Sequence, residues 1–319
     1  RPDLDGMSRL GITKDTEIGL IVSEPGFEPY ERDDGLHPNN QIKNSKKTLS
    51  YNEWLSKLGY DGPNPWNDWA NSAEGENGKI LSGWRLRNSN KPARIPEKHS
   101  ETAFMTNRAM DFIEESKDKP WFLHLSYIKP HWPYMAPAPY HNMYSQNEFY
   151  PVHRNDAEKK NDHPVYKAFM DNSISKTFSK DEVRNTVLSG YMGLIKQIDD
   201  NLGRLFKFLE QLGHMEDTMI VFTSDHGDYH GDHWLGEKEL FHEQSVRVPM
   251  IIYDPSDYAN KTRGTKEERF IEAIDLLPTF LDAVESPASK HRLEGNSLMP
   301  LLKGESTKNW KEFVFSEID

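Results

Sequence analysis

The chain has 319 residues, 35% of them hydrophobic, and a formal net charge of −12. Its mean hydropathy is −0.82, and no run of residues is long and apolar enough to span a membrane, so we expect a soluble protein. The negative charge argues against a general binder of nucleic acid or of anionic membranes. Because the chain has no cysteine, it holds no disulfide, thiolate metal site or cysteine nucleophile. The length suits one large α/β domain or two smaller ones.

Residues 1–48 are rich in glycine, proline, aspartate and asparagine, which is typical of an extended surface segment. Within this segment only the run from Gly19 to Val22 resembles a strand. Ser50 and Glu53 then have the spacing of a capping box, which predicts a short helix that ends at Gly59.

A long polar loop from residue 61 to residue 94 follows and contains Trp66, Trp69 and Trp84. These rings could line a substrate cleft or a partner surface, but we expect them to pin the loop to the body of the protein. A helix is expected after Ser100 and before Pro120. Its apolar side consists of Met105, Ala109, Phe112 and Ile113.

The run from Trp121 to Tyr127 predicts a buried strand, and His131 follows the carboxyl end of that strand. Pro130 and Pro133 restrict the backbone around His131. A histidine in such a loop is usually structural. Because ligands bind beyond the carboxyl ends of the strands in open α/β sheets, a role for His131 in a site stays equally open.

Residues 140–178 show little periodicity and are expected to form an irregular insertion. Ser179 and Glu182 have capping-box spacing and predict the start of the longest helix, which should end at Gly213. Core packing is a sufficient explanation for the apolar stripe of this helix. The stripe consists of Val183, Val187, Tyr191, Leu194, Ile198, Leu202, Leu205 and Leu209.

The run from Met219 to Thr223 predicts a fully buried parallel strand, and Asp225 and His226 follow it. A carboxylate beside an imidazole at a strand end, with Gly227 freeing the backbone, suits a divalent metal ion. The alternative is a polar loop in which these side chains only bond to backbone groups. Further polar residues follow closely: Asp228, His230, Asp232, His233 and Lys238.

A third strand is predicted from Val248 to Tyr253, and a last one from Phe313 to Phe315. Asp275 is expected to cap a helix whose inward residues are Leu277, Phe280, Leu281 and Val284. This order predicts one α/β domain over residues 1–319, with a largely parallel or mixed sheet between helices. So few strands are a small sheet for such a length, and the chain therefore looks incomplete.

The sequences T-S-D-H-G at 223–227, G-D-H at 231–233 and R-V-P-M-I-I at 247–252, together with Lys238, resemble the sulfatase family of the alkaline phosphatase superfamily. Their spacing is most similar to that of bacterial phosphonate monoester hydrolases and phosphodiesterases. The likeness continues in F-L-H-L-S-Y-I-K-P-H-W-P-Y at 122–134 and I-D-L-L-P-T-F-L at 274–281. The resemblance implies an alkaline-phosphatase-like fold.

By this resemblance, Asp225 and His226 would bind one divalent metal ion, which is calcium, manganese, magnesium or zinc. Lys238 and His131 would hold the oxygens of a sulfuryl or phosphoryl group. The resemblance also implies a formylglycine nucleophile from a C/S-x-P-x-R motif, which this sequence lacks. We therefore expect the nucleophile, the first strand of the fold and a small carboxyl-terminal subdomain to lie outside this chain.

The implied activity is hydrolysis of a small anionic sulfate, phosphate or phosphonate ester, on a sugar or an aryl group. One alternative is a phosphoryl transferase of the phosphomutase type from the same superfamily. Another is a non-catalytic relative that binds a glycan or a protein through the tryptophan-rich loops. The sequence leaves open a homo-oligomer, and it leaves open whether the bacterial cytoplasm, the periplasm or the exterior is the compartment.

Overall fold

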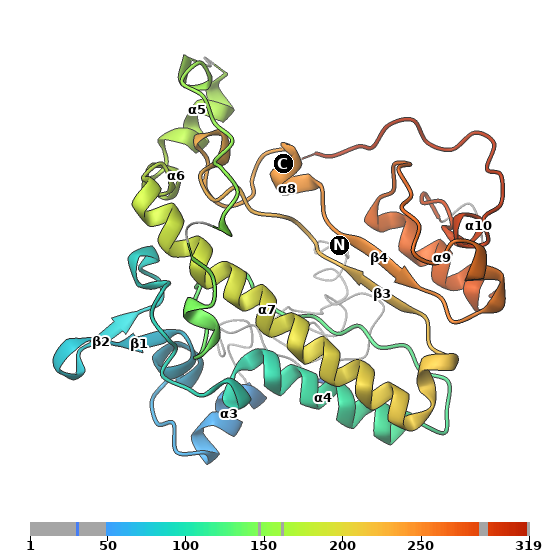
Figure 1. Ribbon diagram of the computed structural model, residues 1–319, viewed down its shortest axis with the longest axis horizontal. Coiled ribbons are helices and arrows are strands. Elements are labelled where there is room, and N and C mark those ends of the chain that lie inside the picture. The colour runs from blue at the N-terminus through green and yellow to red at the C-terminus, as the bar shows by residue number, and fades with distance from the viewer. Residues whose placement is uncertain (1–29, 32–48, 146–147, 161–162, 287–292, 318–319) are drawn as a thin grey trace, which may run out of the picture.

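The computed structural model describes residues 30–31, 49–145, 148–160, 163–286 and 293–317. Its longest element is α7 (Asp181–Leu212), and α4 (Glu101–Ser116) runs beside it (Figure 1). Ile113 of α4 packs in one buried cluster with Leu205 and Leu209 of α7. The apolar stripe predicted for the long helix therefore faces the core.

The strands of the described residues form two antiparallel pairs. β1 (Ser72–Glu74) pairs with β2 (Ile80–Ser82), and β3 (Ile220–Thr223) pairs with β4 (Met250–Tyr253). The first pair projects beyond one end of α7, whereas β3 and β4 run along its flank (Figure 1). Thr223, the last residue of β3, lies opposite Met250. The chain continues from Thr223 into the loop that carries Asp225 and His226.

The remaining elements are short and connect the two long helices and the two strand pairs. The α-helices are α3 (Ser50–Lys57), α5 (Pro164–Asp171), α6 (Ser173–Phe178), α8 (Glu243–Val246), α9 (Leu276–Ala283) and α10 (Met299–Leu302). Short 3₁₀ or π turns cover Trp66–Ala70, Glu76–Gly78, Leu86–Asn88, Glu97–His99, Tyr140–Asn142, Glu158–Lys160, His214–Glu216, Asp232–Trp234, Asp257–Lys261 and Ala273–Asp275. No described helix is long and apolar enough to cross a membrane.

Several helix boundaries agree with the sequence. Ser100 is the N-cap of α4, and its side chain accepts a hydrogen bond from the amide of Ala103. Gly213 ends α7 with a φ of 79°, a conformation that glycine adopts without strain.

Trp66 is 2% exposed, and Trp69 and Trp84 pack against the same cluster. These tryptophans therefore pin their loop to the body, as we expected.

Both predicted capping boxes are wrong, because their serines bond elsewhere. Ser50 is already the first residue of α3, its hydroxyl donates to the Glu31 carboxylate, and the N-cap is Leu49. The hydroxyl of Ser179 donates to the carbonyl of Ser175 at the end of α6, and the N-cap of α7 has no capping side chain. The helices form where predicted, but packing of their apolar sides fixes them rather than these caps.

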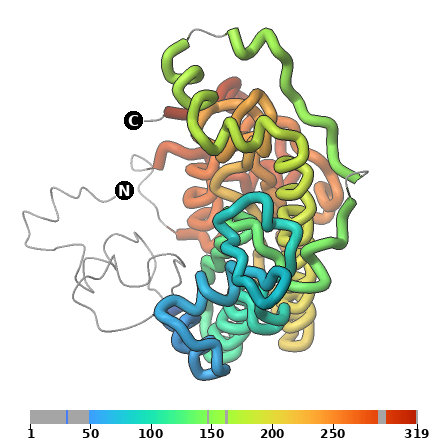
Figure 2. The backbone as a smooth tube through the Cα atoms, turned by 90° about the vertical axis from the view of Figure 1, so that its left-hand side faces the viewer, coloured from blue at the N-terminus to red at the C-terminus, as the bar shows by residue number. Residues whose placement is uncertain are grey.

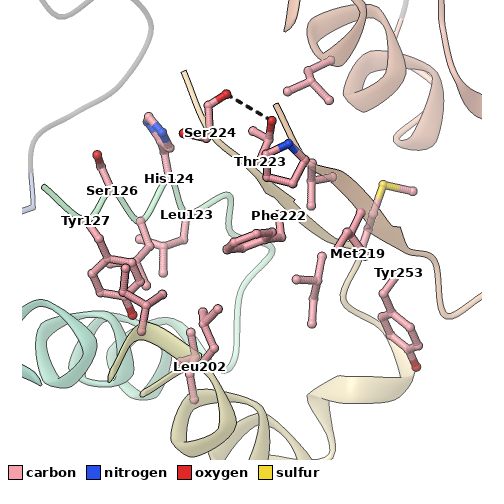
Figure 3. A pocket seen from close by; sticks show the side chains of 18 of the residues that line it. Leu123, His124, Ser126, Tyr127, Leu202, Met219, Phe222, Thr223, Ser224 and Tyr253 are labelled. Carbon is pink, nitrogen blue, oxygen red and sulfur yellow. Dashed lines mark hydrogen bonds between the residues drawn. The ribbon is translucent and has the colours of Figure 1, made fainter. Parts of the chain in front are cut away.

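The prediction of fully buried, parallel strands is wrong for the described residues. β3 is antiparallel to β4 and half exposed. Residues 121–127 are extended, but they join no sheet in the described part of the chain, and alternate side chains are exposed. The exposed side chains of both segments line a hollow of about 3740 Å³, together with residues of α7 and α9. Figure 3 shows Leu123 and Tyr127 on one side of this hollow and Phe222 on the other.

Three further expectations need correction. The segment 140–178 is not irregular throughout, because its second half forms α5 and α6, which stand at the end of the molecule opposite α3 (Figure 2). Leu277 of α9 and Val284 just after it face the hollow and are 56% and 72% exposed, whereas Pro278 and Thr279 are buried. Residues 313–315 form no strand. The strand expected at Gly19–Val22 lies outside the described residues.

Candidate functional site

The loop after β3 presents the first two candidate residues together. The carboxylate of Asp225 accepts a hydrogen bond from the amide of His226 at 3.0 Å, and its side chain is 85% exposed. The Nε2 atom of His226 lies 3.6 Å from Oδ2 of Asp225. Nδ1 of His226 lies 2.8 Å from the carbonyl oxygen of Gly227. A carbonyl can only accept, so Nδ1 carries the proton in this contact and the lone pair of a neutral ring is on Nε2.

This pair fits part of a metal site. Oδ2 of Asp225 and Nε2 of His226 lie close enough to share one ion with little adjustment, and oxygen and nitrogen donors suit the divalent metals named above. Protein metal sites use three or more protein ligands as a rule. Within the described residues no group of three suitable side chains occurs. Asp225 and His226 can thus supply only part of a coordination sphere.

Lys238 and His131 come together from distant parts of the chain. Nζ of Lys238 lies 2.9 Å from Nε2 of His131. Nδ1 of His131 lies 2.7 Å from the carbonyl of Trp132, so the same proton argument leaves Nε2 to accept from the ammonium. The rings of His131 and His226 lie 6.2 Å apart, centroid to centroid. All four residues named from the sequence therefore surround one region at the end of β3, although their roles stay predictions.

The electrostatics of this region favour a neutral His131. Removal of water from around its ring is the largest cause that lowers the pKa of His131, and the ammonium of Lys238 also lowers it. Lys238 is thus the positive group beside this ring. Its ammonium can attract an anionic group locally even though carboxylates, Asp225 among them, lie nearby and the whole chain is acidic.

Gly227 has a steric reason to be glycine. A Cβ atom at this position would lie 2.0 Å from the carbonyl oxygen of Gln244. The amide of Gly227 also donates to the carbonyl of Ser245 at 2.7 Å. This close contact fixes the loop that carries Asp225 and His226 against the segment that follows Lys238. Backbone contacts therefore hold together the two halves of the site, which are the pair of Asp225 and His226 on one side and Lys238 on the other.

Two carboxylates near the site were not assigned a role from the sequence. Oδ2 of Asp228 accepts a hydrogen bond from the hydroxyl of Tyr134 at 3.1 Å, whereas its buried Oδ1 has no partner among the described residues. Burial raises the pKa of Glu237 to about 7, with the neighbouring carboxyl of Glu239 as the next cause. A sequence pattern does not reveal burial at single positions of a loop, so only the three-dimensional structure could show the buried oxygen of Asp228 and the raised pKa of Glu237.

The loop between the two halves of the site has an unusual backbone. His230, His233, Trp234 and Glu237 all have positive φ angles between 45° and 63°. Non-glycine residues adopt this conformation only when their surroundings enforce it. The strain therefore needs an external support.

That support is a segment that we call the arm, residues 148–160 and 163–171. Its Glu158 carboxylate lies 3.0 Å from Nδ1 of His233, and the hydroxyl of its Tyr166 donates to the carbonyl of His233. The indole of Trp234 donates to the carbonyl of Asn155 at 2.7 Å. The arm thus holds the strained loop that leads to Lys238.

Comparison with known proteins identifies the class. The sulfatase family matches residues 26–286, and this chain therefore belongs to the sulfatase family. The alkaline-phosphatase-like fold expected from the sequence is confirmed by solved structures of the same kind.

One relative is the multifunctional alkaline phosphatase superfamily protein PehA of Trinickia caryophylli, to which the chain is 37% identical over 247 residues. This match covers 72% of this chain and 47% of PehA. It is 30% identical over 231 residues to an arylsulfatase of Clostridium perfringens, covering 71% of this chain and 47% of that enzyme. The chain thus spans about half the length of the curated relatives it matches. The solved phosphonate monoester hydrolase SpPMH of Silicibacter pomeroyi superposes with a TM-score of 0.73 at 27% identity, over 89% of this chain and 58% of SpPMH.

Proposed function

We propose that the protein hydrolyses sulfate, phosphate or phosphonate esters with the help of one divalent metal ion. The observation that supports this most directly is the meeting of His131 and Lys238, at 2.9 Å, beside the pair of Asp225 and His226. The names of its relatives include arylsulfatase and phosphonate monoester hydrolase, which favours hydrolysis over phosphoryl transfer or simple binding.

In this proposal Asp225 and His226 hold the metal ion through Oδ2 and Nε2. The bound ion would polarise the transferred group and lower the pKa of the nucleophile. Lys238 and His131 bind the non-bridging oxygens of the ester and stabilise the negative charge that grows on them. In the free chain Nε2 of the neutral His131 ring only accepts, from Lys238, because Nδ1 carries the proton. To donate to an ester oxygen the ring takes up a second proton on Nε2, which the negative charge of the bound substrate favours.

The nucleophile is proposed to come from polypeptide outside this chain. A C/S-x-P-x-R motif, the source of a formylglycine by the family resemblance, does not occur in the sequence. The substrate is proposed to be a small anionic ester on an aryl group or a sugar. Sulfate, phosphate and phosphonate esters share a tetrahedral, negatively charged centre, and the same four side chains can address all three.

The test is Asp225→Ala in the natural full-length protein, with Asp282→Ala, an exposed carboxylate on α9, as the matched control. Metal content is measured by elemental analysis, and hydrolysis is followed with p-nitrophenyl sulfate, bis-p-nitrophenyl phosphate and p-nitrophenyl phenylphosphonate. Asp225→Ala should lose bound metal and lower hydrolysis at least about a hundredfold, as loss of an electrostatic group in an active site does. Full metal content with normal hydrolysis would remove Asp225 from the site.

A further inference from the structure

A buried lysine lies beneath the loop that presents His131. Lys129 is 7% exposed, and its ammonium donates to Oδ1 of Asn71 at 2.7 Å and to the carbonyl oxygen of Pro133 at 2.6 Å. A lysine is very seldom buried to this degree without a specific need, because removal of its charge from water is costly. The desolvation lowers the pKa of Lys129 to about 8.

The two hydrogen bonds of Lys129 close the loop on itself. Pro133 lies four positions after Lys129, and His131 is at the apex between them. The amide of His131 also donates to the carbonyl of Ile128 at 3.0 Å, just before Lys129. The ammonium therefore connects both ends of the turn that carries the imidazole. Its hydrogen bond to Asn71, a residue that is 1% exposed, connects this turn to a separate loop.

A second charge lies below Lys129. Glu101, at the start of α4, is 5% exposed, and its Oε2 accepts the indole proton of Trp66 at 3.1 Å. Its Oε1 has no hydrogen-bond partner among the described residues. Glu101 acts on Lys129 electrostatically, since it is the group that raises the pKa of Lys129 against the effect of burial.

A small cavity of about 10 Å³ joins the two groups. Lys129, Glu101 and Asn71 line it, together with the polar side chains of Ser100, Thr102 and Gln197 and with apolar residues. A site of this size can hold one water molecule when polar partners surround it. The ammonium has three protons and uses two, so one proton remains for such a water, and Oε1 of Glu101 can accept from the same water.

We propose that Lys129 is a positioning residue for His131. Its buried ammonium, bridged by one water to Glu101, fixes the turn of residues 129–133 on α4 and so aims Nε2 of His131 at Lys238. This inference rests on the proposed function, in which His131 binds the oxygens of the substrate. It adds a residue that acts through His131 without touching substrate.

The test separates positioning from simple stability. In the natural full-length protein, Lys129→Met leaves the carboxylate of Glu101 buried and without its counter-charge, so both stability and activity should fall. The double variant Lys129→Met with Glu101→Gln removes both charges and should recover most of the melting temperature. Its kcat should stay about tenfold to a hundredfold below that of the natural protein, because a small misplacement of a catalytic group costs that much. KM should change less than kcat.

The matched control is the exposed pair at the carboxyl end of α4, Lys117→Met with Glu114→Gln, which should leave kcat unchanged. If the Lys129 and Glu101 double variant recovers kcat together with its melting temperature, the role is structural and the proposal is wrong.

A readout independent of activity is amide hydrogen exchange of the peptide that covers residues 128–134. It should accelerate in the Lys129 and Glu101 double variant relative to the control pair, and unchanged exchange would overturn the proposal. If the natural protein hydrolyses none of the three test esters, the proposed function fails, whereas the exchange measurement still decides whether Lys129 fixes the turn.

Discussion

At the scale of single residues, the site depends on which protons the two histidines carry. Nδ1 of His131 faces the carbonyl of Trp132, and Nδ1 of His226 faces the carbonyl of Gly227. In both rings the carbonyl fixes the proton on Nδ1, which leaves Nε2 for the site. One Nε2 thus points at a lysine and the other at a carboxylate, so neighbouring backbone decides the chemistry of each ring.

Lys238 should matter for turnover far more than for folding. Lys238→Ala removes a positive charge where negative charge grows, so kcat should fall about a hundredfold or more in the natural full-length protein. Lys238→Arg should also impair turnover, because a planar guanidinium does not replace a compact ammonium. The unfolding temperature should change little, since the side chain is half exposed. Lys117→Ala is the control, and a near-normal rate for Lys238→Ala would exclude Lys238 from the site.

Glu237 should make stability depend on pH in a defined direction. Its pKa in the folded chain is about 7, above the ordinary value of 4.5. Between these values the folded chain binds more protons than the unfolded chain, so stability falls as pH rises through this window. Because Glu237→Gln cannot ionise, its melting temperature relative to that of the natural protein should increase as pH rises from 4.5 to about 7. Glu243→Gln, an exposed carboxylate, should show no such trend, and parallel curves for both variants would contradict the shift.

At the scale of elements, α7 supports two neighbouring loops through two of its glycines. A Cβ atom on Gly193 would lie 2.1 Å from the carbonyl oxygen of Tyr140, and one on Gly190 would lie 2.4 Å from that of Ser89. Two loop backbones thus rest directly on one side of the helix. The helix can receive them only because it has no side chains at these two positions.

This packing predicts opposite effects for two glycines of the same helix. Gly193→Ala forces a clash with backbone, which should destabilise the protein by about 1–3 kcal/mol despite the better helix propensity of alanine. Gly203→Ala meets no atom within 4 Å, so it should stabilise by up to about 1 kcal/mol. Urea denaturation of both variants measures the difference. Equal free energies of unfolding would show that the loop moves away at no cost.

At the scale of the whole molecule, the sequence predicted what depends on local pattern. The long helix, its end at Gly213 and the strand before Asp225 follow from spacing and turn chemistry, and the structure has them close to the expected positions. The family motifs also brought His131 and Lys238 into one expected site, and the structure places them in contact.

What the sequence could not predict depends on contacts between distant segments. Strand direction was wrong because β3 pairs with β4, and an apolar run has the same pattern in either direction. The burial of Lys129 was missed because a lysine between a strand and a proline looks like an exposed residue. The arm over His233 could not be foreseen, since its contacts come from a segment without clear periodicity.

The contact of α7 with the Tyr140 carbonyl has a consequence for the order of folding. The hydrogen bonds of a helix are local and form within about a microsecond, whereas closing a long loop against it is slower. Because the carbonyl fits only onto a finished helical surface, α7 should form first and act as a template for the loop. A Gly193→Ala chain should then form its helix at the natural rate and be delayed only when the loop docks. Stopped-flow circular dichroism followed beside tryptophan fluorescence would separate these two events.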